Sequence, residues 1–196
     1  EGHELAPRSV YARTKLEAEG RLKQLADQLD FRLLIGRVFG LIAPRQPSHY
    51  VLPGLIRRVQ TATLADIPGL EYCRDYLDSR DVCDALAQLC TTPASKIASV
   101  SVINICSGKE VAIRHLVEEI ILAIQPDNQE KMMNCLTGGP GRPDDIPWLV
   151  GSCERFRALT GREPQQISLA QTIRDALGDG FQQSQPCHTV LRLGDD

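Results

Sequence analysis

Residues 100–124, VSVINICSGKEVAIRHLVEEIILAI, hold the two patterns that decide the fold class. The β-branched run VSVINI at 100–105 is typical of a strand, because Val and Ile pack well on a pleated sheet. After a short SGK turn, apolar residues recur at the spacing i, i+3, i+4 and i+7, which predicts an amphipathic helix. A strand that leads into such a helix indicates an α/β protein with parallel pairing, since parallel strands need helical crossovers. The apolar residues of this helix are Ile113, Leu116, Val117, Ile120, Ile121 and Ile124.

Further helices and strands alternate on the N-terminal side of this stretch. A helix is expected from Tyr11 to about Asp30, after the entry Pro-Arg-Ser at 7–9. The continuous apolar run FRLLIGRVFGLIAP at 31–44 predicts a strand buried on both faces of a parallel sheet. A second helix is expected over 51–61, and strand character returns at 70–77.

The C-terminal side follows the same alternation. Ser79 is expected to cap a helix whose apolar stripe is Val82, Ala85, Leu86, Leu89 and Cys90. Residues 132–136 predict a short strand, and a helix is expected to end at Gly161. A capping box from Ser168 to Gln171 predicts the start of the last helix, which is followed by a polar tail over 179–196.

The composition excludes several classes of protein. With 42% hydrophobic residues, 24% charged residues and a net charge of −3, the chain has the profile of a soluble globular protein. It contains no apolar run long enough to span a membrane and no signal-peptide pattern, so a cytoplasmic location is expected. The absence of a basic run argues against nucleic acid as a partner. The seven cysteines form no CxxC pair, so no metal site is expected, and most of them are interpreted as small buried residues.

The stretch YARTK places Tyr11 and Lys15 four residues apart, on one face of the first predicted helix. A tyrosine phenol has a pKa of about 10 in water, so it acts as an acid or base near neutrality only where a neighbour stabilises the phenolate. A lysine ammonium one turn away does this by charge proximity. Because the same spacing arises readily from composition alone, the pair needs support from the rest of the chain.

Five stretches in order supply that support, and together they resemble the C-terminal part of the extended short-chain dehydrogenases that modify nucleotide sugars. Five ordered motifs are more specific than one Tyr-x-x-x-Lys pair. Within this family the spacing is closest to the GDP-mannose 4,6-dehydratases and the GDP-6-deoxy-4-keto-mannose reductases. The stretches are EGHELAPRSVYARTK (1–15), GRVFGLIAPRQPSHYVLP (36–53), RDYLDSRDVCDAL (74–86), VINICSGKEVAIRHL (102–116) and GRPDDIPWLVGSCERFRALTGREP (141–164).

The resemblance implies the C-terminal part of an extended Rossmann-type fold, with the last parallel strands and a small substrate-binding α/β domain. Residues 1–45 would complete the dinucleotide-binding domain, 46–178 would form mainly the nucleotide-sugar domain, and 179–196 would be the tail. Relatives commonly dimerise through the tyrosine-bearing helix and the next long helix, so a homodimer is expected of the full-length form.

The resemblance also implies catalytic and cofactor-binding roles. Tyr11 would be the acid or base at the sugar hydroxyl or carbonyl, and Lys15 would support the phenolate and hold the nicotinamide ribose. Glu1 lies where dehydratases of the family place the base for water elimination; the alternative is a chain-end residue with no role. Arg37, with Tyr11 and Lys15, is expected to bind the cofactor.

Four residues are expected to bind the substrate: Arg45, Arg74, Arg142 and Asp145. Arg74 and Arg142 match arginines that grip the diphosphate or nucleotide in relatives, and a planar guanidinium suits phosphate oxygens. The alternative for each is a surface salt bridge. Asp75 and Asp81 are expected to be capping or structural residues instead.

Part of the family pattern is missing. The cofactor site of the family depends on a glycine-rich turn after the first strand, where backbone amides receive the pyrophosphate of NAD or NADP. No GxxGxxG follows a predicted strand here, and the glycines at 138–141 lie in a loop. Gly40 stands where relatives carry an asparagine that positions substrate. The chain is therefore expected to be a C-terminal portion that is inactive alone.

Two functions remain open on this basis. The first is the C-terminal portion of an NAD(P)-dependent nucleotide-sugar dehydratase, reductase or epimerase that acts at sugar C4, with a GDP-hexose as substrate. The second is a non-catalytic, degenerate relative that keeps a nucleotide-sugar pocket or a protein-interaction surface.

Overall fold

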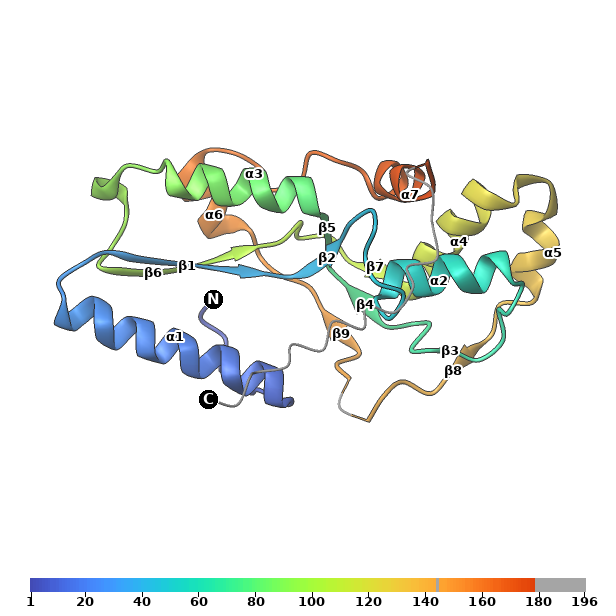
Figure 1. Ribbon diagram of the computed structural model, residues 1–196, viewed down its shortest axis with the longest axis horizontal. Helices are drawn as coiled ribbons and strands as arrows, with labels where there is room; N and C mark the ends of the chain where they lie inside the picture. Colours follow the sequence, from blue (N-terminus) through green and yellow to red (C-terminus); the bar gives the residue numbers. More distant parts are fainter. Residues whose placement is uncertain (144, 179–196) are drawn as a thin grey trace, which may run out of the picture.

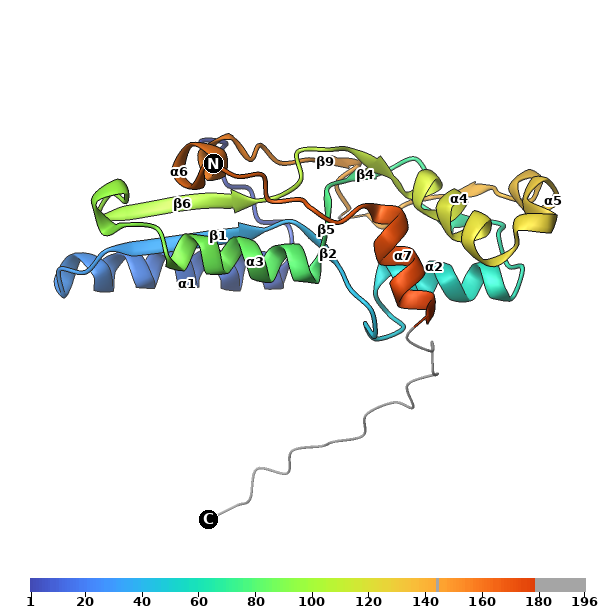
Figure 2. The same cartoon turned by 90° about the horizontal axis from the view of Figure 1, so that it is seen from above.

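The computed structural model describes residues 1–143 and 145–178 as an α/β structure in which short strands alternate with helices (Figures 1 and 2). The helices are α1 (Val10–Gln28), α2 (Val51–Gln60), α3 (Ser79–Cys90), α4 (Ile113–Ile124), α5 (Gln129–Asn134), α6 (Glu154–Thr160) and α7 (Leu169–Gly178). The strands are β1 (Leu33–Val38), β2 (Gly40–Ile42), β3 (Ile67–Pro68), β4 (Cys73–Arg74), β5 (Tyr76–Asp78), β6 (Val100–Ile105), β7 (Val111–Ala112), β8 (Gly138–Gly139) and β9 (Trp148–Leu149).

The longest strands, β1 and β6, form a parallel pair between two layers of helices. They run in register from Leu33 opposite Val100 to Val38 opposite Ile105. Helix α1 lies on one side of the pair, and α3 and α6 lie on the other (Figure 1). This arrangement confirms the α/β class and the parallel pairing predicted from the sequence.

The sequence predicts one continuous strand for the apolar run at 31–44. In the structure this run is broken at Phe39 into β1 and β2. The Phe39 N–H donates to the carbonyl of Ile105 (3.1 Å), whereas the Gly40 N–H donates to the carbonyl of Asp75 (2.8 Å). The chain therefore leaves β6 at this point, and β2 pairs with β5 instead. Nor is β1 buried on both faces, because its residues are half-buried or exposed.

A second group of elements extends beyond the ends of β1 and β6 (Figures 1 and 2). It contains helices α2, α4, α5 and α7 together with the strand pair β3–β8 and the three-stranded sheet β7-β4-β9. In that sheet β4 pairs antiparallel with β7 and parallel with β9. The chain enters this part after β2, returns to the β1–β6 part through β5 and α3, and enters it again after β6.

The structure has two apolar clusters that follow this division. The larger includes Leu52 and Ile56 of α2, Leu116 and Ile120 of α4, and Ile173 of α7. The smaller cluster joins α3, β5, β6 and α6 through Leu77, Val82, Ala85, Leu89, Ile103, Ile105 and Phe156. Ile42 of β2 belongs to the larger cluster, and Leu34 of β1 packs against the smaller one, so residues before 45 contribute to both. The expected domain boundary near residue 45 stays a prediction.

Two predicted elements are wrong in detail. Residues 132–136 do not form a strand, because 129–134 are helical as α5; Gln, Glu, Lys and Met all favour helix over strand. Ser79 is not the cap of α3, because Asp78 precedes it and accepts a hydrogen bond from the Arg80 N–H (2.8 Å). A carboxylate there also interacts favourably with the N-terminal end of the helix dipole.

The capping box before α7 is half formed. The Ser168 hydroxyl accepts a hydrogen bond from the Gln171 N–H (3.2 Å), as predicted. The Gln171 side chain, however, donates to Asp175 (2.6 Å) one turn further along. Gly161 follows α6 in the left-handed conformation (φ 73°), which confirms the predicted end of that helix. The predicted polar tail at 179–196 lies outside the described residues.

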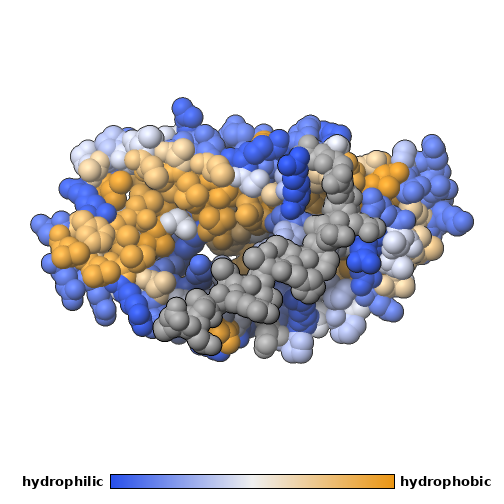
Figure 3. Space-filling view, viewed as in Figure 1, coloured by the Kyte–Doolittle hydropathy of each residue, from blue (hydrophilic) through white to orange (hydrophobic). Residues whose placement is uncertain are grey.

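One face of the molecule exposes apolar side chains around β1 (Figure 3). On β1, the N–H groups of Leu33 and of Phe39, just beyond the strand, donate to the chain at β6, so the intervening N–H groups of Leu34, Gly36 and Val38 point away from it. Among the described residues no strand pairs with this edge. The exposed apolar side chains on the flanking segments are Leu22, Leu25, Leu29, Phe31 and Leu86.

Candidate active site

The Tyr11–Lys15 pair lies in the first turns of α1. The Ser9 hydroxyl caps this helix by accepting a hydrogen bond from the Ala12 N–H (3.1 Å), which fixes the start of the helix just before Tyr11. The Lys15 Nζ lies 5.4 Å from the centre of the Tyr11 ring, within the range of a cation–π contact. Tyr11 is 72% exposed, so the phenol is open to an incoming molecule.

Tyr11 shares one flank of α1 with exposed leucines. Leu22 and Leu29 follow Tyr11 by eleven and eighteen residues, which are close to three and five helical turns. All three side chains are exposed. The face of the molecule seen in Figure 3 gathers apolar side chains around β1. The helical spacing therefore places the phenol on the same flank of α1 as these two leucines.

Arg37 is engaged with α1. Its Nε and Nη2 donate to the two carboxylate oxygens of Glu19 (2.9 and 2.6 Å), and the two side chains are only 23% and 17% exposed. The hydrogen bonds from Arg37 hold the pKa of Glu19 below its ordinary value. The cofactor role of Arg37 stays a prediction, and Glu19 was not among the residues that sequence reasoning selected.

Glu1 lies against β6. Its carboxylate accepts a hydrogen bond from the Asn104 N–H (2.8 Å) and lies 3.7 Å from the Nε of Arg155 on α6. The Glu1 side chain is only 6% exposed. Both contacts are with residues outside α1, and its role as a base in elimination stays a prediction.

Two of the expected substrate-binding residues meet on β4 and the loop before β9. The Arg74 Nη2 donates to the Asp145 carboxylate (2.6 Å), and the guanidinium lies 5.8 Å from the ring centre of Tyr72. Arg74 is 18% exposed and Asp145 is 40% exposed, so this pair borders solvent. The Asp145 N–H donates to the carbonyl of Arg142 (3.0 Å).

The remaining expected arginines are on exposed loops. Arg142, three residues before Asp145, is exposed. Arg45, three residues after the end of β2, is also exposed. Arg45 has a φ of 63°, a left-handed conformation that a non-glycine residue adopts only when its surroundings favour it.

Asp75 organises the loops beside Arg74, which confirms its predicted structural role. Its buried carboxylate accepts hydrogen bonds from the Ser107 N–H (2.7 Å) and hydroxyl (2.7 Å), the Gly108 N–H (2.9 Å) and the Gly151 N–H (3.2 Å). One side chain thus ties β4 to the turn after β6 and to the residues after β9. Asp81 has a similar capping role, because it accepts from the N–H groups of Gln166 (3.2 Å) and Ile167 (3.0 Å).

The space around Gly40 explains why no side chain stands there. A Cβ at this position would lie 2.5 Å from the Asp75 carbonyl and 2.8 Å from the Tyr76 ring. Burial raises the pKa of Tyr76 to about 12, so its phenol is neutral near pH 7. The ring of Tyr76 fills the place beside β2, so the asparagine that the family resemblance leads one to expect has no room in this arrangement.

A network that sequence reasoning missed joins α3 to α7. Burial raises the pKa of Asp78, but hydrogen bonds from Arg80 and Thr172 outweigh this effect and lower it overall. Arg80 also contacts Asp175 (2.7 Å). Asp78 and Asp175 lie far apart in the sequence, and no local pattern connects them, so the sequence did not predict this network.

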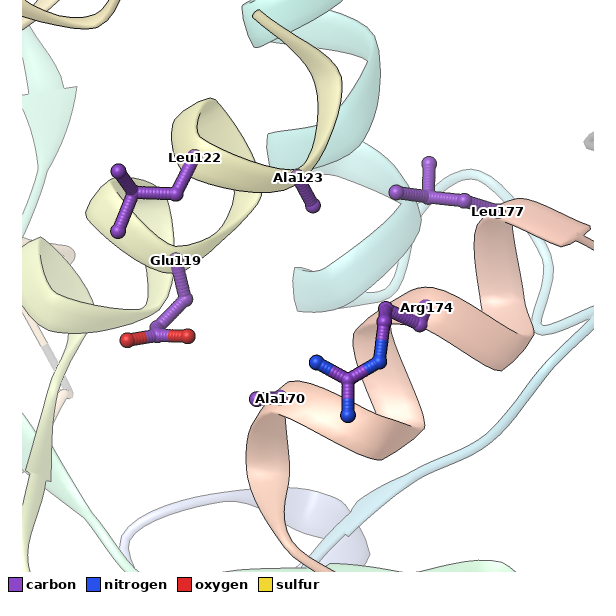
Figure 4. Close-up of a pocket in the computed structure, with 6 residues that line it drawn as sticks. All are labelled: Glu119, Leu122, Ala123, Ala170, Arg174 and Leu177. Atoms are coloured by element: carbon purple, nitrogen blue, oxygen red, sulfur yellow. The ribbon is translucent and has the colours of Figure 1, made fainter. Parts of the chain in front are cut away.

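A hollow of about 410 Å³ opens elsewhere, between α4 and α7 (Figure 4). None of the residues predicted to act in catalysis or binding lines it. Glu119 and Arg174 come from the two facing helices. The lining residues are Glu119, Leu122, Ala123, Ala170, Arg174 and Leu177.

Within the described part of the chain, no group of three or more His, Cys, Asp or Glu side chains could hold a metal ion, and no helix is long and apolar enough to cross a membrane. Cys106 and Cys153 are buried, but Cys83, Cys90 and Cys135 are exposed. The prediction that most cysteines are buried is therefore wrong.

The fold and the helix-borne Tyr-x-x-x-Lys pair define the class as a Rossmann-like α/β protein of the short-chain dehydrogenase type. The profile of the NAD dependent epimerase/dehydratase family matches residues 1–106, more than half of the chain. The chain belongs to that family, which confirms the resemblance seen in its five motifs.

Two relatives show how far the similarity extends. GDP-6-deoxy-D-mannose reductase of Pseudomonas aeruginosa is 29% identical over 181 residues, covering 88% of this chain and 56% of the relative. The structure of RMD from Pseudomonas aeruginosa complexed with NADPH is 26% identical with a TM-score of 0.68, covering 86% of this chain and 55% of that one.

A more distant structure supports the fold alone. UDP-N-acetylglucosamine 4-epimerase from Methanobrevibacter ruminantium, in complex with UDP-N-acetylmuramic acid, has a TM-score of 0.77 at 21% identity. The match covers 91% of this chain and 55% of the epimerase. The chain thus spans about half the length of the relatives it matches.

Proposed function

We propose that this chain is the part of an NAD(P)-dependent nucleotide-sugar dehydratase, reductase or epimerase that carries the catalytic helix and the sugar-nucleotide site. The observation that carries the proposal is the exposed Tyr11 phenol with the Lys15 ammonium 5.4 Å from its ring centre. It is joined by the family membership and by the 29% identity to a GDP-6-deoxy-D-mannose reductase. A GDP-hexose is the substrate, and the reaction takes place at C4 of the sugar.

Tyr11 moves the proton of the reacting oxygen. In the reductive direction the phenol gives its proton to the C4 carbonyl oxygen, and in the oxidative direction the phenolate takes the proton of the C4 hydroxyl. When bound, NADH or NADPH would supply the hydride to C4 in the reductive direction, and NAD or NADP would accept it in the oxidative direction. Lys15 would stabilise the phenolate and hold the nicotinamide ribose. In a dehydratase Glu1 would take the proton at C5 as the neighbouring hydroxyl leaves as water.

The described residues fit only the nicotinamide end of such a cofactor. Gly138 and Gly139 form β8 against Ile67 and Pro68, so they are not a phosphate-binding turn between a strand and a helix. A further α/β segment must therefore supply the pyrophosphate site. The unpaired edge of β1 and the apolar flank of α1 beside it are the places where such a segment would pack.

Arginines on β4 and the neighbouring loops bind the diphosphate of the substrate. Arg74 already holds a carboxylate at 2.6 Å, and a phosphate oxygen can take the same position on its guanidinium. Arg142 and Arg45 add positive charge from exposed loops, and Asp145 is free to bond the nucleoside once phosphate replaces it on Arg74. Two copies of the full-length protein would pack through α1, the helix that carries Tyr11.

Calorimetry with GDP-mannose, and with UDP-glucose as the competing nucleotide, tests the binding part. We expect GDP-mannose to bind, and Arg74→Gln to weaken it by about 10- to 100-fold, since a hydrogen bond to a charged group contributes about 1.5–3 kcal/mol. The control is Arg21→Gln, which breaks an exposed ion pair on α1. No binding of either nucleotide sugar, or equal effects of the two variants, would refute the proposed site.

Turnover tests the catalytic part. The chain is combined with the α/β segment that carries the pyrophosphate site. Oxidation of NADPH with a GDP-4-keto-hexose reports a reductase, and conversion of GDP-mannose in the presence of NAD, followed by chromatography, reports a dehydratase or epimerase. Tyr11→Phe should abolish turnover and leave GDP-sugar binding unchanged. The second candidate, a non-catalytic nucleotide-sugar-binding module, is favoured by the filled space at Gly40; binding without turnover in the combined protein would support it.

A further inference from the structure

The side of α1 that faces the sheet contains two charged residues, Glu19 and Lys23, where apolar ones are usual. The residues of this helix with reduced exposure are Ala12, Leu16, Glu19, Lys23 and Ala26, at spacings of four, three, four and three. This spacing marks one stripe of the helix. Only Ala26 is fully buried, so apolar packing holds α1 weakly.

Glu19, in the middle of that stripe, forms the most specific contact between α1 and β1. Both of its carboxylate oxygens accept hydrogen bonds from Arg37, at 2.9 and 2.6 Å. The paired fork fixes direction as well as distance. The two side chains are 23% and 17% exposed, whereas the Glu17–Arg21 pair on the same helix is 75% exposed at Arg21 and 63% at Glu17.

Glu19 also lies in line with the proposed catalytic pair. Tyr11, Lys15 and Glu19 follow one another at intervals of four residues and so form one ridge of the helix. Glu19 is about 12 Å from Tyr11 along the axis, at 1.5 Å per residue. A rotation of α1 by roughly 20° would move a side chain at a radius of about 5–6 Å by about 2 Å, and a misplacement of about 1 Å can cost a factor of about 100 in rate.

We propose that Glu19 is a positioning residue: through its paired hydrogen bonds to Arg37 it sets the rotation of α1 over β1, and with it the place of Tyr11 and Lys15 in the active site. This inference rests on the proposed function for its catalytic consequence. Its structural part, the coupling of Glu19 to Arg37 across the helix–sheet contact, does not depend on turnover.

The structural part is tested on the 196-residue chain by amide hydrogen exchange. Glu19→Gln should speed exchange in the first half of α1 by about tenfold, the factor that corresponds to about 1.4 kcal/mol of lost local stability. Arg37→Gln should do the same, and the double variant should add little. Glu17→Gln, the matched control, should leave exchange unchanged. Equal effects of Glu19→Gln and Glu17→Gln, or additive effects at Glu19 and Arg37, would overturn the coupling.

The catalytic part is tested on the chain combined with its cofactor-binding segment. Glu19→Gln should lower kcat by about 10- to 100-fold while KM for the GDP sugar stays within about twofold. Arg37→Lys keeps the positive charge but loses the paired hydrogen bonds, so its kcat should lie between those of Glu19→Gln and the unmodified chain. The exchanged pair E19R/R37E should recover most of kcat. A loss confined to KM for NADPH, or no recovery in the exchanged pair, would assign Arg37 to the cofactor instead. If the unmodified protein shows no turnover, the proposed function fails, and the exchange measurements alone decide the coupling.

Discussion

Replacing Asp75 by asparagine should destabilise the protein strongly, although the two side chains have nearly the same shape. Asp75 is 1% exposed, and each of its two carboxylate oxygens accepts two hydrogen bonds. One oxygen accepts from the N–H and hydroxyl of Ser107, and the other accepts from the N–H groups of Gly108 and Gly151. An asparagine amide has only one oxygen to offer, so its NH₂ group must face one of the two donor pairs. The amide will turn this group toward Ser107, because that hydroxyl can rotate to accept whereas the other pair consists of two backbone N–H groups.

The magnitude follows from what remains unsatisfied. The Ser107 N–H would face another donor, and an orphaned buried N–H costs about 1–3 kcal/mol. The bonds from Gly108 and Gly151 would lose the assistance of the negative charge, which removes roughly a further 1 kcal/mol. Asp75→Asn should therefore lower the free energy of unfolding by about 2–4 kcal/mol, a large part of the roughly 5–15 kcal/mol of a typical domain.

Urea denaturation followed by circular dichroism measures this change. The matched control is Asp84→Asn, because Asp84 is exposed on α3 and accepts a single hydrogen bond from Gln88 (2.6 Å); it should shift the free energy of unfolding by less than about 0.5 kcal/mol. Ser107→Ala removes only one donor and should cost about 1 kcal/mol. If Asp75→Asn lowers the free energy of unfolding no more than Asp84→Asn does, the hydrogen bonds accepted by Asp75 do not stabilise the loops.

Three further outcomes are expected. Gly151→Ala should destabilise by about 1–3 kcal/mol, since a Cβ there would lie 2.6 Å from the sulfur of Cys106, whereas Gly20→Ala, with open space around it, should stabilise α1 by about 0.5–1 kcal/mol; thermal unfolding compares them. The folded-state pKa of Glu19 is lowered, so its contribution is present above its unfolded pKa of about 4.3 and is lost as pH falls through the lower folded value. The stability difference between the unmodified chain and Glu19→Gln should therefore be largest near pH 7 and vanish in strong acid, as urea titrations at several pH values would show. Burial raises the pKa of Cys106 to about 12, so this thiol should react with a thiol reagent far more slowly than exposed Cys83, as mass spectrometry of the labelled peptides can determine.

The elements that the sequence predicts well are those whose signal is local. The buried residues of helix α4 are all apolar, and its observed bounds, Ile113–Ile124, match the predicted pattern. Strand β6 likewise occupies the β-branched run at 100–105. In both cases local propensity and tertiary packing favour the same structure, so the prediction needs no knowledge of the partners.

The wrong predictions lie where contacts with residues far away in the sequence, or a weak local pattern, determine the secondary structure. The break at Phe39 exists because β1 and β2 pair with strands that lie far away in sequence, and nothing in the apolar run marks the change. The helix at 129–134 is short, so its few residues carry too weak a period to separate helix from strand.

The candidate site was predictable in its residue types but not in their partners. Tyr11 and Lys15 meet because four residues on a helix always bring side chains together. The Arg74–Asp145 contact joins residues 71 positions apart, and no spacing predicts it. Glu19 did leave a signal, since it stands four residues after Lys15 and interrupts the sheet-facing stripe of α1.

That interruption bears on how the site could work. A helix with one fully buried side chain has little apolar packing to fix its rotation, and exposed leucines on its flank leave a second surface for another segment to cover. A partly buried, paired ion contact is directional where apolar contacts are not, so it can select one rotation at a small cost in stability. The phenol of Tyr11 needs such selection, because proton transfer demands that the oxygen stand within hydrogen-bond reach of the sugar. Placement of α1 by Glu19 and Arg37 on one side, and by the packing of a cofactor-binding segment on the other, would allow the catalytic geometry to form only when both halves are together.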